Sequence, residues 1–214
     1  MQWGRIQPRG FYAKSVLEVA PAVLGCILVR KASDGPVLAG RVVEVEAYAG
    51  DGSDPSAHSH RGPTERNRSM FGPPGHLYAY SIYGIHTCIN LVCEPSGSGS
   101  AVLIRAIEPL SGIEQMRLNR GLGTEAKGPQ IASGPGRLAQ ALGFSLSDDG
   151  RPLNRSDLCM RAPGPEAPRL RVARGPRIGI SKAVELPYRF YEEGNPWVSR
   201  MPRKKQKGGR KREG

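Results

Sequence analysis

Two glutamates and one tyrosine alternate along an otherwise apolar stretch at residues 41–48, RVVEVEAY. The valine-rich run follows a turn signal and predicts a β-strand, in which alternate side chains point to opposite faces. Glu44, Glu46 and Tyr48 then share one face with Val42. An acid one pleat from an aromatic ring can act in catalysis. The alternative is an edge strand whose polar face is exposed to solvent.

Polar side chains also interrupt three later strand-like runs, which span residues 77–82, 85–93 and 101–107. Tyr80 shares a face of the first run with Tyr78, and Asn90 lies in the second. Arg105 stands in the middle of the third, AVLIRAI. An unpaired charge inside a sheet costs several kcal/mol, so this arginine needs an acidic partner, for which Glu44 or Glu46 is the candidate.

Together these residues predict a pocket of aromatic faces with one carboxylate and one guanidinium. Such a pocket suits a planar, electron-poor or cationic ring, because an aromatic face attracts positive charge by ~0.5 to 2 kcal/mol. Glu46 could hold a water molecule as general base, and Arg105 would keep it ionised. In a basic protein the expected ring is a nucleobase, which must be flipped out of a duplex before it can react. Tyr83, at a strand corner, is placed to fill the gap.

A long irregular segment at residues 49–76 precedes these strands. A loop of this length within one domain is either disordered or functional. Taken singly its polar residues have ordinary explanations, since a loop histidine is usually solvated. Their number argues for function, and they include His58, Arg61, Arg66, Asn67, Arg68, Met70 and Phe71.

The remaining patterns predict short helices and strands. Three serines are candidate helix caps: Ser15 for residues 16–23, Ser111 with Glu114 for a helix to about residue 120, and Ser133 for a helix that ends at Gly143. Further strands are expected at residues 26–30, near 158, and at 170–173, 177–181 and 188–191, with a turn at Asp34-Gly35.

Composition indicates one domain without a membrane segment. The 214 residues contain no run of 18 or more apolar residues, and Glu18 and Pro21 interrupt the apolar stretch near the N-terminus, so neither a transmembrane helix nor a signal peptide is predicted. A cytosolic location is the default expectation. The cysteines form no Cys-x-x-Cys pair and are expected to be buried free thiols rather than metal ligands; they are Cys26, Cys88, Cys93 and Cys159.

The net charge of +12 favours a polyanionic partner. Residues 200–214 hold eight Lys and Arg against one acid, which places +7 of this charge in the tail and +5 in the rest of the chain. The tail is rich in glycine and has no apolar residue after Met201, so it is expected to be disordered. It could bind phosphate backbones without reading sequence, or serve as a localisation signal.

In ten places the chain resembles the alkyladenine (3-methyladenine) DNA glycosylase family, in order from about Phe11 to Ser199. The resemblance implies an α+β fold, a single mixed domain with a curved antiparallel β-sheet flanked by helices. It places this domain at residues 11–199, after an N-terminal extension at 1–10 and before the basic tail at 200–214. The matching segments are RVVEVEAY (41–48), AHS (57–59), RNRSMF (66–71), GHLYAYSIYG (75–84), Asn90, VLIRAIEP (102–109), SGP (133–135), RIG (177–179), RFY (189–191) and PWVS (196–199).

The resemblance also implies a role for each site residue. Glu46 deprotonates the attacking water, which Arg105 and a backbone carbonyl near Ile178 help to position. Asn90 crowds the exocyclic amine of normal guanine. The flipped purine lies between Tyr48, His58 and Tyr80, while the DNA is contacted by Tyr83 as a wedge and by Thr64, Arg66 and Met70.

These roles describe a monofunctional hydrolase for alkylated or deaminated purines that starts base excision repair. The family needs no metal or organic cofactor, and no lysine lies among the proposed pocket residues to act as an amine nucleophile. The expected partner is duplex DNA with damaged purines, with no membrane, and the protein is expected to be a monomer. Its expected location is cytoplasmic, associated with the nucleoid in a bacterium or nuclear in a eukaryote.

Two other classes of function are considered. A non-catalytic nucleic-acid-binding protein that stacks bases on tyrosines explains the charge and the aromatic residues, but leaves Glu46 without a role. A formyl- or other group-transfer enzyme with a similar sheet requires a folate or nucleotide site, for which the sequence has no motif.

Overall fold

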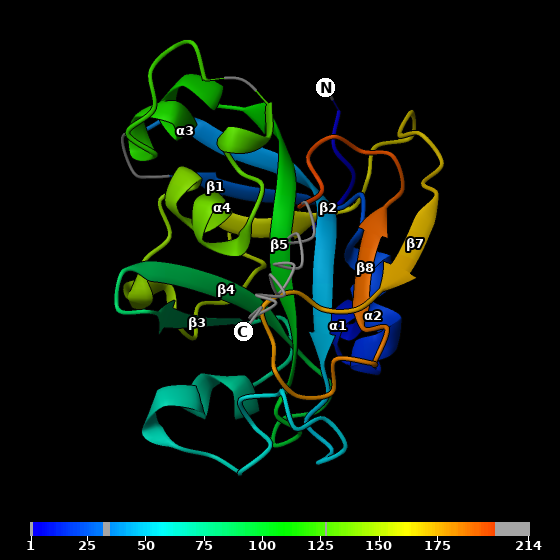
Figure 1. Cartoon of the computed structure of the whole chain (residues 1–214). Helices are drawn as coiled ribbons and strands as arrows, with labels where there is room; N and C mark the ends of the chain where they lie inside the picture. Colours follow the sequence, from blue (N-terminus) through cyan, green and yellow to red (C-terminus); the bar gives the residue numbers. More distant parts are fainter. Residues whose placement is uncertain (1, 32–34, 127, 200–214) are drawn as a thin grey trace, which may run out of the picture.

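The two longest strands, β2 (Val37–Tyr48) and β5 (Ser100–Ser111), pair antiparallel at the centre of the sheet (Figure 1). The computed structural model describes residues 2–31, 35–126 and 128–199. The strand order is β3-β4-β5-β2-β1-β6, and β8 joins the sheet beside β2 and carries β7. The other strands are β1 (Ile27–Lys31), β3 (Leu77–Ile82), β4 (His86–Cys93), β6 (Leu158–Arg161), β7 (Val172–Gly175) and β8 (Arg189–Glu192).

Strand β2 changes neighbours along its length. On one side it pairs with β5 throughout, whereas on the other its first half pairs with β1 and the segment Glu44 to Glu46 pairs with β8. The two glutamates therefore lie inside the sheet, and both are fully buried. The edge-strand alternative is wrong.

The sheet curves strongly. In Figure 1, β3 and β4 run across the direction of β2 and β5, although every pairing between strands is antiparallel. The predicted α+β fold, a curved antiparallel sheet flanked by helices, is confirmed. No helix among the described residues is long and apolar enough to span a bilayer.

A β-bulge between β2 and β5 sets the direction of the Arg105 side chain. The register shifts on both sides of Glu44, and Arg105 has no residue directly opposite it on β2. Such bulges bend a strand and redirect a side chain, and they are frequent beside active sites. Here Arg105 reaches both glutamates of β2.

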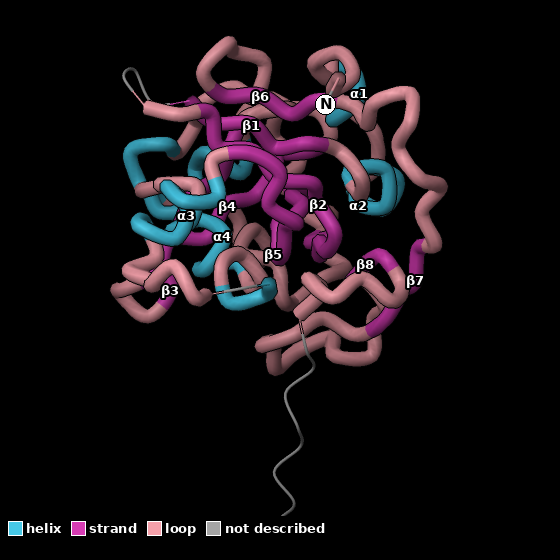
Figure 2. The backbone as a smooth tube through the Cα atoms, turned by 90° about the horizontal axis from the view of Figure 1, so that it is seen from above, coloured by secondary structure: helices cyan, strands magenta, loops and turns pink. Residues whose placement is uncertain are grey.

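Helices cover the sheet in two groups. Figure 2 shows α3 (Ile113–Asn119) and α4 (Pro135–Ala141) on one side, and α1 (Arg9–Tyr12) and α2 (Val16–Val23) on the other. Apolar residues of α2 and α4 pack with those of the central strands in one core. Short 3₁₀ helices lie at η1 (Glu65–Phe71), η2 (Gly128–Gln130) and η3 (Leu146–Asp148).

One of the three predicted serine caps is confirmed. Ser15 accepts a hydrogen bond from the backbone N–H of Leu17 at the start of α2. The other two are wrong, because Ser111 remains in β5 and Ser133 forms a bridge to Ala106. The N-cap residues of α3 and α4 are the glycines at 112 and 134, both with positive φ.

Of the remaining predictions, the one for the cysteines is confirmed and one predicted strand is wrong. The four cysteines are buried free thiols, as predicted. The strand expected at residues 177–181 is absent from the described structure, which has an irregular loop there. The N-terminal segment is attached to β6, since backbone N–H groups of Gly4 and Gln7 donate to the carbonyls of Ala162 and Met160. The expected Asp34-Gly35 turn and the basic tail involve residues outside the described ones.

The loop that leaves β2 toward the site is tightly placed at Gly50. Its N–H donates to Oγ of Ser100 at 2.8 Å. A Cβ atom at this position would lie 2.0 Å from the carbonyl oxygen of Ser98, which is far shorter than a van der Waals contact. Only glycine fits between β2 and the turn that precedes β5.

We expect Gly50→Ala to lower the free energy of unfolding by ~1 to 3 kcal/mol, because the added methyl group forces two backbone segments apart. The measurement is the midpoint of denaturant unfolding. Gly123→Ala is the matched control, since a Cβ there meets no atom within 4 Å. Equal midpoints for both variants and the wild type would show that the loop moves without cost.

Candidate active site

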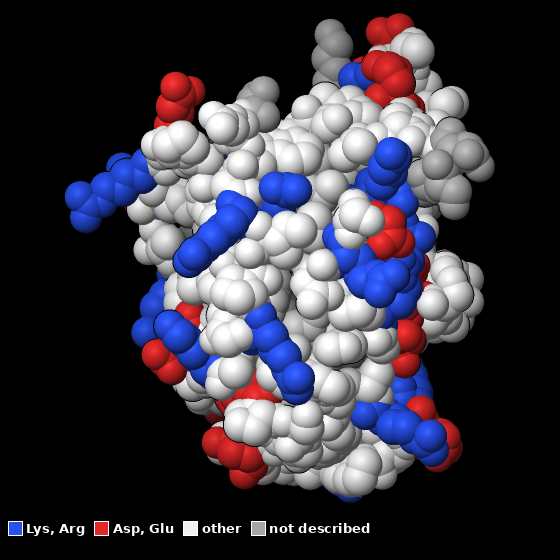
Figure 3. Space-filling model, turned by 180° about the vertical axis from the view of Figure 1, so that it is seen from behind, with Lys and Arg blue, Asp and Glu red and all other residues white. Residues whose placement is uncertain are grey.

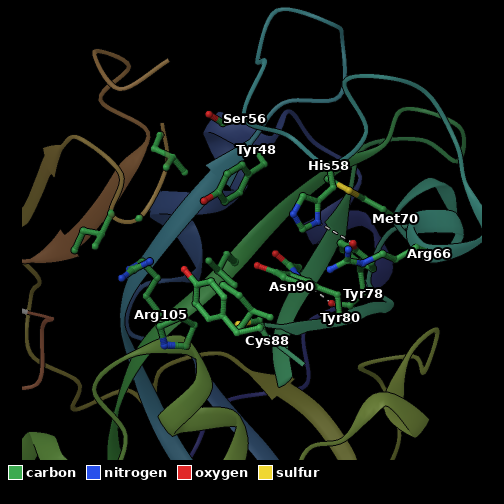
Figure 4. A pocket seen from close by; sticks show the side chains of 17 residues that line it. Tyr48, Ser56, His58, Arg66, Met70, Tyr78, Tyr80, Cys88, Asn90 and Arg105 are labelled. Atoms are coloured by element: carbon green, nitrogen blue, oxygen red, sulfur yellow. Dashed lines mark hydrogen bonds between the residues drawn. The ribbon is translucent and has the colours of Figure 1, made fainter. Parts of the chain in front are cut away.

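A cavity of about 430 Å³ opens where the loop after β2 approaches β3 and β4 (Figure 4). This volume lies within the range of small-molecule sites in proteins. Aromatic rings form much of its wall, with one amide and two guanidinium groups. The lining residues labelled in Figure 4 include Tyr48, His58, Arg66, Tyr78, Tyr80, Asn90 and Arg105.

Glu46 lies just behind this wall. Its side chain is fully buried and accepts three hydrogen bonds. The backbone N–H of Ile178 donates to Oε1 at 2.7 Å, and the hydroxyl of Tyr48 donates to Oε2 at 2.9 Å. Nη1 of Arg105 donates to Oε2 at 3.2 Å. All three donors belong to residues that line the cavity.

A second carboxylate completes a buried charge cluster, which we define as Glu44, Glu46, Arg105 and Arg189. Oε1 of Glu44 accepts from Nε of Arg105 at 3.2 Å and from Nε of Arg189 at 2.6 Å. Oε2 accepts from the backbone N–H of Ser199 at 2.7 Å. The acidic partner predicted for Arg105 is therefore both glutamates. Burial opposes the charge of Arg105, but Glu46 and Glu44 more than offset this and raise its pKa.

The aromatic part of the wall is a connected set of rings. Nδ1 of His58 and the hydroxyl of Tyr78 are joined by a hydrogen bond of 2.9 Å, drawn as a dashed line in Figure 4. The ring of Tyr80 stacks on Tyr78 at 5.4 Å and meets His58 edge-on at 4.6 Å. Sequence reasoning placed Tyr78 on this face but gave it no role, since nothing in the sequence pairs it with His58.

Tyr48 forms the opposite part of the wall. Burial raises the pKa of its hydroxyl well above the ordinary value, and the neighbouring Glu46 raises it further. The hydroxyl therefore remains protonated and acts as the donor to Glu46. The guanidinium of Arg177 lies 4.6 Å from the ring centroid of Tyr48, on one face of the ring.

The loop at residues 176–180 supplies a backbone group and a side chain to the site. The amide N–H of Ile178 donates to Glu46. The carbonyl near Ile178 that the resemblance implied as a partner of the water stays a prediction. Arg177 is buried and pairs with Asp54, which sequence reasoning did not single out. No strand forms here, because these groups bond to Glu46 and Asp54 instead of to a neighbouring strand.

The other predicted residues fall into a buried and an exposed group. Asn90 is buried, and its amide nitrogen donates to the carbonyl of Tyr78 at 3.0 Å. Met70, expected to contact DNA, is 2% exposed and lies in the cavity wall. Arg66 also lines the cavity and donates to the carbonyl of Ser81, while Thr64 is exposed just before η1.

The corner between β3 and β4 projects from the molecule. Tyr83 is 85% exposed and has a positive φ of 54°, and Ile85 is 76% exposed. Two large apolar side chains therefore project from one exposed turn, and Tyr83 also lines the cavity. The sequence indicated the corner but not the second apolar side chain.

Surface charge does not form a single patch on the face that Figure 3 shows. Lys and Arg side chains are spread over a mostly uncharged surface, with one group of them beside acidic residues along an edge. The moderate charge of the chain before residue 200 agrees with this spread.

Comparison with known proteins gives a consistent result over nearly the whole chain. The family Methylpurine-DNA glycosylase (MPG) matches residues 10–196. A protein of Methanoculleus marisnigri is 46% identical over 195 residues, covering 90% of this chain and 98% of its own. A protein of Rhodopseudomonas palustris is 47% identical, and the match covers 92% of this chain and 89% of that protein. A protein of Burkholderia cenocepacia is 49% identical, and the match covers 92% of both chains. All three are named for an expected 3-methyladenine DNA glycosylase activity.

His58 gives a pH-dependent prediction. Burial lowers the pKa of its imidazole below the ordinary 6.5, and the nearby Arg66 lowers it further. We therefore expect a titration midpoint below 6.5 in an NMR measurement of the ring, with Arg66→Gln raising the midpoint. Arg68→Gln is the control, because Arg68 is exposed and does not act on His58.

The same pKa shift sets the sign of a stability change. The unfolded chain takes up a proton at His58 at a higher pH than the folded one, so this contribution to stability is lost as pH falls below about 6.5. The wild type should lose more free energy of unfolding than His58→Gln over this interval. Parallel losses in both proteins would contradict a neutral, buried imidazole.

Proposed function

The chain belongs to the methylpurine-DNA glycosylase family, and on that premise we propose that it is a monofunctional DNA glycosylase. It flips alkylated or deaminated purines out of duplex DNA and hydrolyses the N-glycosidic bond, which starts base excision repair. The catalytic domain is assigned to residues 11–199, an assignment that the family match at 10–196 supports.

The position of Glu46 is the observation that carries this proposal. Its Oε1 accepts one hydrogen bond, from Ile178, and a carboxylate oxygen has room for a second donor. In this proposal the attacking water binds at Oε1, on the side of Glu46 that faces the cavity lined by Tyr48 and Arg105. A protein that only binds nucleic acid has no need of a buried carboxylate behind its base-stacking rings.

The proposed reaction balances without a cofactor. Glu46 takes a proton from the water while the water oxygen forms a bond to C1′ of the sugar. The bond from C1′ to the base nitrogen breaks, and its electron pair leaves with the base. Alkylation at a ring nitrogen makes the base cationic and a better leaving group, and the negative charge of Glu46 stabilises the oxocarbenium-like sugar. No step of this proposed reaction uses an amine nucleophile, and for this reason the enzyme is assigned as monofunctional.

The aromatic wall supports the assignment of a purine as substrate. Tyr48 on one side and His58 with Tyr80 on the other offer ring faces and edges to a flipped base. Asn90 is held by its bond to the carbonyl of Tyr78, so its amide has a fixed position. In this proposal it crowds the exocyclic amine of undamaged guanine.

The residues around the mouth of the cavity are assigned to the DNA duplex. Tyr83, exposed at the corner between β3 and β4, fills the space that the flipped nucleotide leaves. Thr64 and Arg66 contact the backbone beside it. Met70 supports the wall from inside, because it is buried against Tyr78.

Replacing the general base tests the mechanism. Glu46→Gln should lower the rate of 3-methyladenine release from alkylated duplex DNA by ~10² or more, while binding to an abasic-site analogue is retained. Glu65→Gln is the control, since Glu65 is exposed on η1. A wild type that binds DNA but frees no base would establish a binding protein instead.

Deletion of residues 201–214 tests the role of the basic tail. This segment holds seven Lys and Arg, so its loss should weaken DNA binding equally for all sequences and flatten the salt dependence of the dissociation constant. Base release at saturating enzyme should persist. A change in which damaged base is removed would show that the tail acts in the pocket.

A further inference from the structure

A fully buried ion pair lies behind the proposed active site. Nη1 of Arg177 is 2.5 Å from Oδ2 of Asp54, and Nη2 is 2.8 Å from Oδ1, so the contact is bidentate. Both side chains are inaccessible to solvent. A buried ion pair adds little net stability, because desolvation offsets the attraction, but a bidentate pair fixes the relative orientation of the two groups.

The orientation of Arg177 determines the surroundings of Glu46. Its Nη1 also donates to the carbonyl of Ala47 at 2.9 Å, and its guanidinium lies over the ring of Tyr48. The next residue, Ile178, donates its N–H to Glu46. Arg177 and its neighbour thus contact three successive residues of β2.

The orientation of Asp54 determines the loop that follows β2. Its Oδ1 accepts from the N–H of Ser56 at 3.0 Å, and its Oδ2 accepts from the N–H of Ala49 at 3.4 Å. The loop between Tyr48 and His58 is folded around this carboxylate. One ion pair therefore joins the loop that leads to His58 with the loop that carries Ile178.

We propose that Arg177 and Asp54 are positioning residues for base excision: their ion pair holds the Ile178 amide on Glu46 and the ring of Tyr48 at the wall of the cavity. The inference rests on the proposed glycosylase function. Arg177 does not line the cavity among the described residues, so it acts through Tyr48 and Ile178. Small displacements of such groups from a reactive geometry lower rates by large factors.

The first test is single-turnover release of 3-methyladenine from alkylated duplex DNA by full-length protein. Asp54→Asn and Arg177→Lys should each lower the rate by ~10- to 100-fold at saturating enzyme. The dissociation constant for an abasic-site analogue should stay within ~3-fold of the wild type, because displaced groups slow the reaction step more than they weaken binding.

Asp148→Asn is the matched control. Asp148 is also a buried carboxylate in an arginine ion pair, with Arg30 at 2.7 Å, but neither residue lines the cavity. This variant should lose stability like Asp54→Asn and keep the wild-type rate. An equal loss of rate in both variants would overturn the proposal in favour of a general effect of stability.

A double variant separates positioning from stability. In Asp54→Leu/Arg177→Met, apolar side chains replace both charges, an exchange that often restores or raises stability. We expect a midpoint of thermal unfolding near that of the wild type together with the slow rate of the single variants. A stable double variant with a rate within ~3-fold of the wild type would overturn the proposal, since orientation by ion pairing is then unnecessary.

Hydrogen exchange of the wild type provides a test of the proposal that does not depend on the folding of the rate variants. The Ile178 amide should exchange slowly, like core amides of β2, because the ion pair holds it on Glu46. Exchange at the rate of an open loop would overturn the proposal. If the wild type releases no base, the proposed function fails, and the exchange of Ile178 in the wild type and in Asp54→Asn still decides whether the ion pair holds this amide.

Discussion

The burial of four charges is the constraint on which the rest of the structure depends. Glu44 and Glu46 project from the centre of a sheet, where an unpaired carboxylate costs several kcal/mol. Arg105 and Arg189 balance them, one from β5 and one from β8. The two strands must therefore flank β2, and the register shift beside Glu44 must be present for Arg105 to reach both acids.

The same constraint explains why the reactive carboxylate is assigned to a strand and not to a loop. A strand paired on both sides holds its side chains with little freedom, which suits the water-binding role proposed for Glu46. The loops supply the other polar groups of the site, namely the imidazole of His58 and the backbone amide of Ile178. They are fastened to the strand by Arg177, which bonds to the carbonyl of Ala47.

Period-two alternation and the rarity of charge in apolar runs were sufficient to predict part of the site. They placed Glu46 and Tyr48 on one face and required a partner for Arg105 from the sequence alone. They could not predict that Asp54 pairs with Arg177, because the two lie 123 positions apart and no local pattern connects them. The amide of Ile178 is a backbone group and has no residue-specific signal at all.

The errors in the helix caps have a similar origin. Ser111 and Ser133 have the local composition of N-caps, but the pairing of β5 and a bridge to Ala106 recruit them into the sheet. Local side-chain bonding and strand pairing compete for the same residues, and here strand pairing prevails. The cap at Ser15, which has no strand to join, formed as its sequence indicated.

The long sequence separations in the charge cluster have a consequence for biosynthesis. Glu46 bonds to a residue 132 positions later, and Glu44 bonds to residues 145 and 155 positions later. A ribosome makes the glutamates early and their partners near the end of translation, so the growing chain exposes two acids without their complete set of partners for most of its synthesis. The buried charge cluster has its full set of partners only after residue 199 has been added, so the sheet around Glu44 and Glu46 closes late in synthesis.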